Sequence, residues 1–544
     1  MHERHHSHWP VGLPHSLPPS NNSIFQNLVD AVVDAPNATA IEYYGAHLTY
    51  SELLLQTNAI AGYLDSHAQV AADDRVIVYM QNSPQFIVAY YAILAANAVV
   101  VPVNPMCKRA ELEHIVRDSG ARTIFFGAEL SDEVEAVANV VDSLHRISTH
   151  YGDYAGLDLL ETQRVPKVVK DRCETKSNID WVHVLEMDCS PPLHERGPDD
   201  WCAIPYSSGT TGKPKGCLHT HRSVNATVRC YPSWVGLQKG SRILATLPFC
   251  HVTGMQHSMN LPILTGSTIY LMTRWDAHLA ADLIERERIQ HWRSITTMMI
   301  DFLSLPDIAN RDLSSLQAVG GGGAQMPESI ARKLQELLSL DYIEAYGLTE
   351  TMAALHMNPI HAPRKQCLGI PLFGVDSRIF DPTSFSLLGP NETGEIITAA
   401  PQLFEGYWNR PEDDKAAFIE IDGKRFFRTG DLGYFDDDGF FYFVDRLKRM
   451  INVSGLKVWP AEVEAILHGH PDIAEACVVA DADPRTGEAV RAVVVAAPGS
   501  AELAQTALTD WCRENMAAYK VPKRFEFRST LPRSSAGKVL WKEL

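Results

Sequence analysis

Short runs of apolar residues alternate with stretches of helical spacing over the first four-fifths of the chain. The runs are rich in β-branched residues, as buried strands are. Between two such runs, residues 84–96 place apolar side chains at helical intervals, and residues 109–119 do the same further on. Strand–helix alternation of this kind predicts an α/β fold with mostly parallel β-sheets covered by helices. The predicted strands are Arg75–Met80, Val99–Val103, Thr123–Gly127 and Ile269–Met272.

The pattern changes near Asp445, where a charged loop precedes a shorter α+β series. That series contains predicted helices at 460–468 and 503–516 and predicted strands at 474–480 and 492–497. It has about a hundred residues, enough for a small domain. We therefore predict a flexible His/Pro-rich tail (1–20), a large N-terminal domain (21–444) and a small mobile C-terminal domain (445–544).

Composition narrows the class of protein. The chain has 544 residues, 45% of them hydrophobic, which suits a globular protein. The formal net charge of −18 argues against nucleic acid as a partner, since such binding favours a basic face. The longest apolar run, Phe86–Val103, is broken by Asn97 and Pro102, so we expect no integral membrane segment. Without a signal-peptide pattern or paired cysteines, the expected location is cytoplasmic.

The segment Tyr206–Gly216, YSSGTTGKPKG, has the composition of a polyphosphate cradle. Glycine lets backbone amides approach an anion, hydroxyls add donors, and lysine adds charge. The segment is not a Walker A loop, because only two residues separate Gly209 from Gly212 and Pro214 follows Lys213. The predicted phosphate-binding residues are Ser207, Ser208, Gly209, Thr210, Thr211, Gly212 and Lys215.

This string resembles the signature loop of the adenylate-forming superfamily: acyl-CoA synthetases, adenylation domains and firefly-type luciferases. Four further motifs follow in the order that the family has them, and the resemblance extends from about Phe25 to Leu544. It is greatest to bacterial medium- or long-chain fatty-acyl-CoA ligases. The four motifs are Ala345–Thr351 (AYGLTET), Arg428–Gly433 (RTGDLG), Val444–Gly455 (VDRLKRMINVSG) and Pro532–Lys538 (PRSSAGK).

The resemblance implies a nucleotide site. The Tyr346 ring, beside Gly347, would stack near adenine, Thr349 would contact phosphate, and the hard carboxylate of Glu350 would help to hold Mg²⁺. Four successive glycines are costly in a regular element and leave room for a ligand. In that glycine segment, adenine would lie against Gly322, Gly323 and Ala324, and the floor of the acyl pocket would be Gly320 and Gly321.

The motifs nearer the C-terminus are implied to complete the site. Asp431 would accept hydrogen bonds from the ribose hydroxyls, and Arg446 would reach the nucleotide. The small domain of such enzymes rotates between two poses, and Lys448 would lie at the hinge. In the second pose a loop with room for the pantetheine arm of coenzyme A would approach the site. That loop contains Ser454, Gly455 and Lys457, and Lys538 would be the catalytic lysine of the first pose.

The implied reaction has two half-reactions. A carboxylate attacks the α-phosphorus of ATP and expels pyrophosphate, and a thiol then attacks the acyl-adenylate and releases AMP. Positive charge from Lys538, the loop and Mg²⁺ would offset the repulsion between two anions. ATP and coenzyme A are thus the expected co-substrates.

The acyl pocket is expected near His251, Val252, Met255 and Met298, which are mostly apolar. The sequence offers no obvious buried arginine or lysine for a second substrate carboxylate, so the expected acid is apolar and monocarboxylic, a medium- or long-chain fatty acid. His251 would gate the carboxylate, or it is a histidine of the core. Short-chain, sulfur-containing and aromatic acids remain open.

Other functions share these motifs. The acceptor could be a separate carrier protein in place of coenzyme A, and a luciferase-type oxidation is a remote alternative. A non-catalytic acyl-nucleotide binding protein is opposed by the presence of Lys538, Glu350 and Asp431. A homodimer also remains open.

Overall fold

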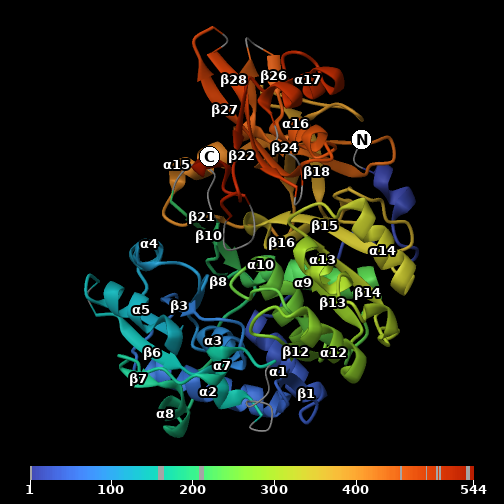
Figure 1. The fold of residues 1–544 in the computed structure, drawn as a ribbon. Helices are drawn as coiled ribbons and strands as arrows, with labels where there is room; N and C mark the ends of the chain where they lie inside the picture. The colour runs from blue at the N-terminus through green and yellow to red at the C-terminus, as the bar shows by residue number, and fades with distance from the viewer. Residues whose placement is uncertain are drawn as a thin grey trace. The chain divides into compact units, whose positions relative to one another are not determined.

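The computed structural model describes residues 3–141, 143–156, 164–207, 213–453, 456–485, 487–497, 500, 504–533 and 539–544. The chain divides into two compact units, whose course can be followed by colour in Figure 1. The first contains Met1–Asp376 and Ala399–Phe427, and the second contains Ser377–Thr398 and Arg428–Leu544. The predicted boundary between the large and the small domain, at residue 445, stays a prediction.

One sheet of the first unit contains the glycine-rich and YGLTE segments. Its central strands are parallel, and β2, β16 and β17 are antiparallel to their neighbours. The strand order is β17 (Ile370–Pro371), β16 (Ala353–Met357), β15 (Tyr342–Leu348), β14 (Ala318–Gly322), β13 (His291–Ser294), β11 (Arg242–Ala245), β12 (Thr268–Leu271), β1 (Thr39–Tyr43) and β2 (Ala46–Thr49).

The other large sheet of this unit contains the ends of the phosphate loop. It is parallel from β8 to β7, and β10 pairs antiparallel with β8, β9 and β21. The strand order is β21 (Gly406–Tyr407), β10 (Lys215–Thr220), β8 (Trp201–Ala203), β4 (Val99–Val103), β3 (Arg75–Tyr79), β5 (Thr123–Gly127), β6 (His145–Thr149) and β7 (Ile179–Asp180), and β9 (Tyr206–Ser207) pairs with β10.

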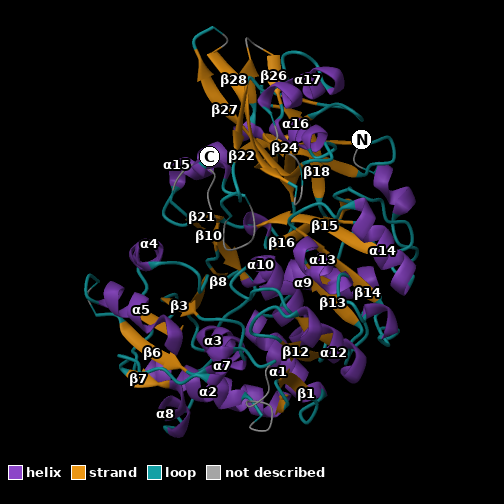
Figure 2. Cartoon of the chain, viewed as in Figure 1, coloured by secondary structure: helices purple, strands orange, loops and turns teal. Residues whose placement is uncertain are grey.

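Helices cover both sheets, as Figure 2 shows in purple. One hydrophobic core includes Leu28 of α1, Ile87 of α3, Val78 of β3 and Leu244 of β11, so helices and strands of both sheets share it. Every residue of α3 is buried, which explains its apolar sequence on all sides. The helices of this unit are α1 (Ile24–Asp34), α2 (Tyr50–Ser66), α3 (Pro84–Ala95), α4 (Arg109–Ser119), α5 (Ser131–Ala138), α7 (Lys167–Lys170), α8 (Trp181–Glu186), α9 (His221–Val235), α10 (Val252–Gly254), α11 (Leu261–Leu264), α12 (Ala277–Glu287), α13 (Thr296–Leu303), α14 (Glu328–Leu338) and α15 (Pro411–Ala417).

The predicted α/β class is confirmed, and the predicted strands and helices of this unit agree with the structure to within one residue at their ends. The described part of the N-terminal tail packs in part against the rest of the first unit. Trp9 is buried against Trp234 and Phe373, and the His15 carbonyl accepts a hydrogen bond from the Gly374 amide. The large aromatic side chain of Trp9 buries apolar surface, although the residues around it in the sequence are mostly polar.

The second unit contains a sheet in the order β26 (Leu456–Val458), β25 (Ile451–Val453), β28 (Gly487–Ala496) and β27 (Ile473–Asp483), with β29 (Arg524–Phe527) beside β28. Helices α16 (Pro460–Leu467) and α17 (Gln505–Asn515) belong to this unit, and Val463 and Leu508 share a core with Val478 and Val490. Its other strands are β18 (Asp376–Asp381), β19 (Ser386–Leu387), β20 (Gly394–Ala399) and β24 (Phe441–Arg446), with most of β23 (Lys424–Phe435), whose first residues pair with β22 (Phe418–Ile421).

Within the described part of the chain, no helix combines the length and apolar character that crossing a bilayer requires.

Candidate active site

Two short strands hold the ends of the predicted phosphate loop. Ser207 on β9 lies opposite Lys215 on β10 in an antiparallel pair, so the chain leaves and returns at one place. The predicted residues between them, 208–212, lie outside the described residues. Before the loop, the Tyr206 hydroxyl donates to Asp118 Oδ2 at 2.8 Å, and Arg410 donates to Asp118 Oδ1 at 2.8 Å. These contacts fix the base of the loop.

Glu350 is connected to the phosphate loop through Tyr407, a residue that the sequence analysis missed. Glu350 lies in the 3₁₀ turn η6 (Thr349–Thr351), and its Oε1 accepts a hydrogen bond of 2.8 Å from the Tyr407 hydroxyl. The Lys215 ammonium lies 5.1 Å from the centre of the Tyr407 ring and 2.5 Å from Asp413 Oδ1. The structure thus brings together two predicted residues, Lys215 and Glu350, which both contact Tyr407.

The backbone around Glu350 is held by a buried histidine. His219 Nε2 lies 2.9 Å from the Thr349 carbonyl oxygen, and the Phe404 amide donates to the Glu350 carbonyl. Burial lowers the pKa of His219 to about 4, so the ring is neutral near pH 7. Since a carbonyl can only accept, Nε2 carries the proton and donates it. His219 therefore acts as a positioning residue, and sequence reasoning also missed it.

Gly347 is required by the chain that passes beside it. A Cβ at this position would lie 1.6 Å from the Ala353 carbonyl oxygen. Met352 and Ala353, which follow the η6 turn, have φ of 44° and 83°. Backbone strain of this kind clusters at functional sites. Tyr346, the predicted adenine neighbour, is buried with its ring 5.4 Å from the ring of His356.

The glycine-rich segment has a structural explanation that differs from the expected one. A Cβ at Gly321 would lie 1.9 Å from the Ser294 carbonyl oxygen, and one at Gly322 would lie 2.3 Å from that of Ala345. Neighbouring strands β13 and β15 therefore require these glycines. Gly323, with φ of 87° and no atom within 4 Å of its Cβ position, has open space beside it, as a ligand-facing residue needs. Ala324 is the second residue after the end of β14.

Three of the residues predicted for the acyl pocket lie at or in the helix that begins at α10. His251 precedes that helix, and its Nε2 lies 3.3 Å from Asn104 Nδ2, while Val252 is in α10 itself. Met255 is fully buried at the start of the π-helical segment η4 (Met255–Asn260). On α13, the Met298 Sδ lies 3.6 Å from the Thr246 hydroxyl.

The expectation that this region lacks a buried arginine is wrong. Arg293 on β13 is 3% exposed, and it pairs in register with Gly320 of the predicted pocket floor. The arginine stands between His291 and Trp292 on one side and Ser294 on the other, in a strand whose four residues are all buried. Because the strand is short and contains polar residues, its burial was not evident from the sequence.

Within the second unit, the predicted ribose and nucleotide residues meet. Asp431 on β23 is fully buried, and its Oδ1 forms an ion pair of 2.6 Å with Arg446 Nε on β24. The charged loop predicted near Asp445 contains a largely buried ion network, since Arg449 contacts both Asp445 and Glu464. Lys448 is in the 3₁₀ turn η7 (Leu447–Arg449), and Lys457 is in β26. Ser454, Gly455 and Lys538 lie outside the described residues.

The described side chains alone would not complete the coordination of a magnesium ion, so the substrate would have to supply further ligands. No group of three potential metal-ligating side chains occurs in the described ranges. Mg²⁺ commonly binds through one or two carboxylates, substrate phosphates and water. Glu350, with one oxygen oriented by Tyr407, is such a carboxylate.

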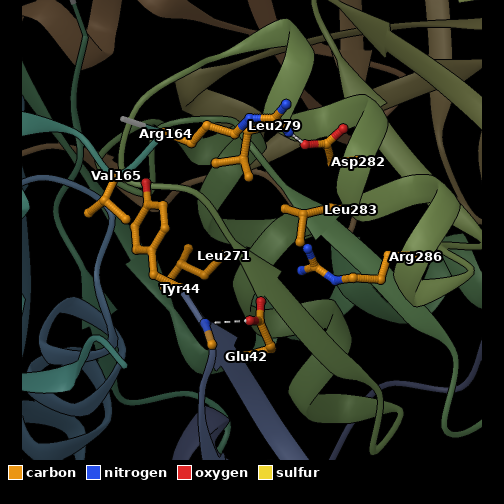
Figure 3. A pocket seen from close by; sticks show the side chains of 10 residues that line it. Glu42, Tyr44, Arg164, Val165, Leu271, Leu279, Asp282, Leu283 and Arg286 are labelled. Atoms are coloured by element: carbon orange, nitrogen blue, oxygen red, sulfur yellow. Dashed lines mark hydrogen bonds and ion pairs between the residues drawn. The ribbon is translucent and has the colours of Figure 1, made fainter. Parts of the chain in front are cut away.

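A separate pocket of about 300 Å³ lies near β1 and α12 (Figure 3). Its wall combines the apolar side chains of Leu271, Leu279 and Leu283 with the carboxylate of Glu42, which accepts a hydrogen bond from the Gly45 amide at 2.8 Å. None of its lining residues is among the predicted site residues.

Comparison with known proteins identifies the class. Residues 28–408 match the family model described as AMP-binding enzyme, and residues 462–538 match that of the AMP-binding enzyme C-terminal domain. The chain belongs to the AMP-binding enzyme family. The ATP-bound MatB from Rhodopseudomonas palustris has the same fold, with a TM-score of 0.84 and 25% identity over 96% of this chain and 98% of that chain.

Curated relatives define the activity more closely. A long-chain-fatty-acid–CoA ligase from Bacillus subtilis (strain 168) is 32% identical over 98% of this chain and 96% of its own length. A feruloyl-CoA synthase from Amycolatopsis sp is 34% identical over 93% of this chain and 95% of its own length. The protein is an AMP-forming acid–CoA ligase, with a carboxylic acid, ATP and coenzyme A as its small-molecule substrates. The predicted family and enzyme class are thus confirmed.

Proposed function

We propose that this ligase activates a fatty acid of medium or long chain as its acyl-adenylate and then transfers the acyl group to coenzyme A. The relative named a long-chain-fatty-acid–CoA ligase supports the class of acid. The apolar burial of Val252, Met255 and Met298 supports an apolar body for that acid. An aromatic acid is the second candidate, supported by the relative named feruloyl-CoA synthase.

The observation that carries the adenylation step is the Lys215–Tyr407–Glu350 arrangement. It places a cation and a carboxylate on one hydroxyl-bearing ring, next to the ends of the phosphate loop. A polyphosphate beside Lys215 would gain charge-assisted hydrogen bonds. Mg²⁺ on Glu350 would neutralise phosphate charge during displacement of pyrophosphate. The substrate carboxylate needs no general base, since it is already ionised at pH 7.

We further propose that Asp431 binds the ribose diol and that Lys538 contacts the reacting phosphate. A carboxylate with two acceptor oxygens suits a vicinal diol, and the ion pair with Arg446 orients the buried Asp431 carboxylate. In the second half-reaction, Lys538 would withdraw and the Ser454–Gly455 loop would admit the thiol arm.

A panel of acids with ATP, scored for pyrophosphate and AMP with and without coenzyme A, tests the activity. We expect turnover that depends on both acid and coenzyme A. Turnover that ignores coenzyme A would favour a carrier protein as the acceptor. The absence of pyrophosphate with every acid would contradict adenylation.

The role of Lys538 has a separate test. In Lys538→Ala we expect acid-dependent pyrophosphate release to fall about a hundredfold or more, because one preorganised charge is lost from the transition state. Thioester formation from a supplied acyl-adenylate should change much less. Equal losses in the two half-reactions would refute the assignment.

A further inference from the structure

Arg293 is a buried guanidinium that has no anionic partner among the described residues. It is 3% exposed, and no carboxylate of the described residues forms an ion pair with it. Its Nε atom also lacks a hydrogen-bond partner among those residues. An arginine keeps its charge at any ordinary pH, and an unpaired charge away from water is strongly unfavourable. The site is therefore electrostatically incomplete.

Two ring-bearing side chains of the described residues, Tyr231 and His257, lie near Arg293 and supply no negative charge. Its guanidinium carbon lies 5.2 Å from the centre of the Tyr231 ring on α9. Tyr231 in turn packs against the His257 ring, with 5.1 Å between ring centres. Burial, followed by the charge of Arg293, lowers the pKa of His257 well below its usual value, so this ring is neutral. Both neighbours are polar, and neither is an anion.

His257 adds a second unsatisfied group to the same place. It is 2% exposed, and its Nδ1 has no hydrogen-bond partner in the described chain. It belongs to the π-helical segment η4, and such segments occur frequently at functional sites. The Ser258 hydroxyl beside it is likewise buried and unpaired among the described residues. A pocket for a purely apolar chain has no use for these groups.

The location connects this cluster to the predicted acyl pocket. Arg293 pairs in register with Gly320, and a Cβ at Gly320 would lie 2.6 Å from Arg293 Nη1. The guanidinium thus lies over the position that glycine leaves without a side chain. Gly320 is two residues before Gly322, where the adenylate end of the substrate is expected, which is roughly 7 Å along a strand.

We propose that Arg293, with Tyr231 and His257, binds a second carboxylate at the far end of the acid, so that the substrate is a dicarboxylic acid with a short body between its two carboxyl groups. This inference rests on the proposed function, because it uses the predicted position of the adenylate. It keeps the proposed reaction and replaces the simple fatty acid with an acid that has two carboxylates. One carboxylate is adenylated, and the other completes the charge of Arg293 through a bidentate pair.

Paired acids of equal length provide the test. Glutarate, adipate and pimelate are compared with valerate, caproate and heptanoate, and terephthalate is compared with p-toluate, in the complete enzyme with ATP and coenzyme A. We expect kcat/KM to favour the dicarboxylate of the best pair by about a hundredfold or more, since a site built for a polar group rejects an analogue without it. A wild-type enzyme that uses the monocarboxylates as well or better overturns the proposal.

Arg293→Met, which removes the charge and keeps a long apolar side chain, identifies the residue responsible. We expect kcat/KM for the dicarboxylate to fall about a hundredfold, mainly through KM, while the monocarboxylate keeps or gains activity. Equal losses for both acids would indicate a merely structural role and refute the proposal. If Arg293→Met does not fold, Arg293→Lys and the wild-type preference test the proposal instead. We expect the Arg293→Lys variant to retain the preference for the dicarboxylate. Loss of this preference in the lysine variant would contradict the proposal.

The two levels of inference fail differently. If monocarboxylic acids are ligated to coenzyme A and Arg293→Met leaves the selectivity unchanged, the second-carboxylate site is wrong and the proposed function stands. If no acid of either kind gives AMP with coenzyme A, the proposed function is wrong. In that case, a thermal-shift measurement with ATP and adipate still tests the carboxylate site. Stabilisation of the wild type but not of Arg293→Met would support the site. Absence of stabilisation in both proteins would overturn the proposed carboxylate site.

Discussion

Removing one hydroxyl, in Tyr407→Phe, should impair adenylation through Glu350. The Tyr407 hydroxyl donates to Glu350 Oε1 at 2.8 Å, and the ring itself stays in place beside Lys215 in the variant. A hydrogen bond to a charged group is generally worth about 1.5–3 kcal/mol. Since both side chains are only partly buried, we take the lower end, which corresponds to a loss of about tenfold in rate.

The assay is acid-dependent exchange of pyrophosphate into ATP, measured over a range of Mg²⁺ concentrations. We expect a rate about tenfold lower in Tyr407→Phe and a higher Mg²⁺ concentration at half-maximal rate, because Glu350 is no longer held in one orientation. A positioning role predicts both changes, whereas a general loss of folding would lower the rate without changing the dependence on Mg²⁺.

Tyr442→Phe is the matched control, since the Tyr442 hydroxyl also donates to a carboxylate, Asp436 Oδ2 at 3.2 Å, in the second unit. The control should retain the wild-type dependence on Mg²⁺. If Tyr407→Phe also retains both the wild-type rate and the wild-type dependence, the assigned role of the Tyr407–Glu350 contact is refuted.

Two further predictions concern stability. In Gly347→Ala we expect the free energy of unfolding to fall by about 1–3 kcal/mol and the exchange activity to be lost, because the new Cβ would lie 1.6 Å from the Ala353 carbonyl oxygen. A wild-type free energy of unfolding, measured by chemical denaturation, would contradict this prediction. Acidification from pH 7.5 to 5.5 should lower the thermal midpoint of unfolding, because burial lowers the pKa values of several histidines. As the pH falls, these histidines take up protons in the unfolded chain before they do so in the folded protein. The stabilising contribution of the histidines is therefore complete above about pH 6.5 and is lost as the pH falls toward their folded pKa values. Glu344, whose pKa burial raises to about 7, opposes this in part, and an unchanged midpoint would contradict the dominance of the histidines. The histidines are His219 and His291, each with a pKa of about 4, His221 and His356, each with a pKa of about 3, and His257.

Much of the fold follows from the sequence, because local patterns determine it. The apolar strand at 99–103 and the helix at 109–119 have the predicted bounds, since each is bordered by polar or turn-forming residues. In the second unit, β27 and β28 extend beyond the predicted strands. In the parts of β27 and β28 that lie beyond the predicted strands, charged side chains alternate with other residues. Pairing between the two strands holds these parts in place, and no local sequence pattern reveals that pairing.

The site was predictable only as far as its motifs extend. Tyr407, His219 and Arg293 act through contacts between residues far apart in the sequence, so each looks ordinary where it stands. One local signal was available for Arg293, which interrupts a short strand between buried aromatic and small residues. An arginine in such a strand must find an anion or remain unpaired, and that choice depends on tertiary structure.

Acyl-adenylate formation is the central claim, and exchange of labelled pyrophosphate into ATP without coenzyme A tests it most directly. We expect exchange that requires both the acid and Mg²⁺, with AMP released only after coenzyme A is added. Exchange that proceeds without acid, or acid-dependent acyl-CoA formation that yields ADP and phosphate in place of AMP and pyrophosphate, would contradict it.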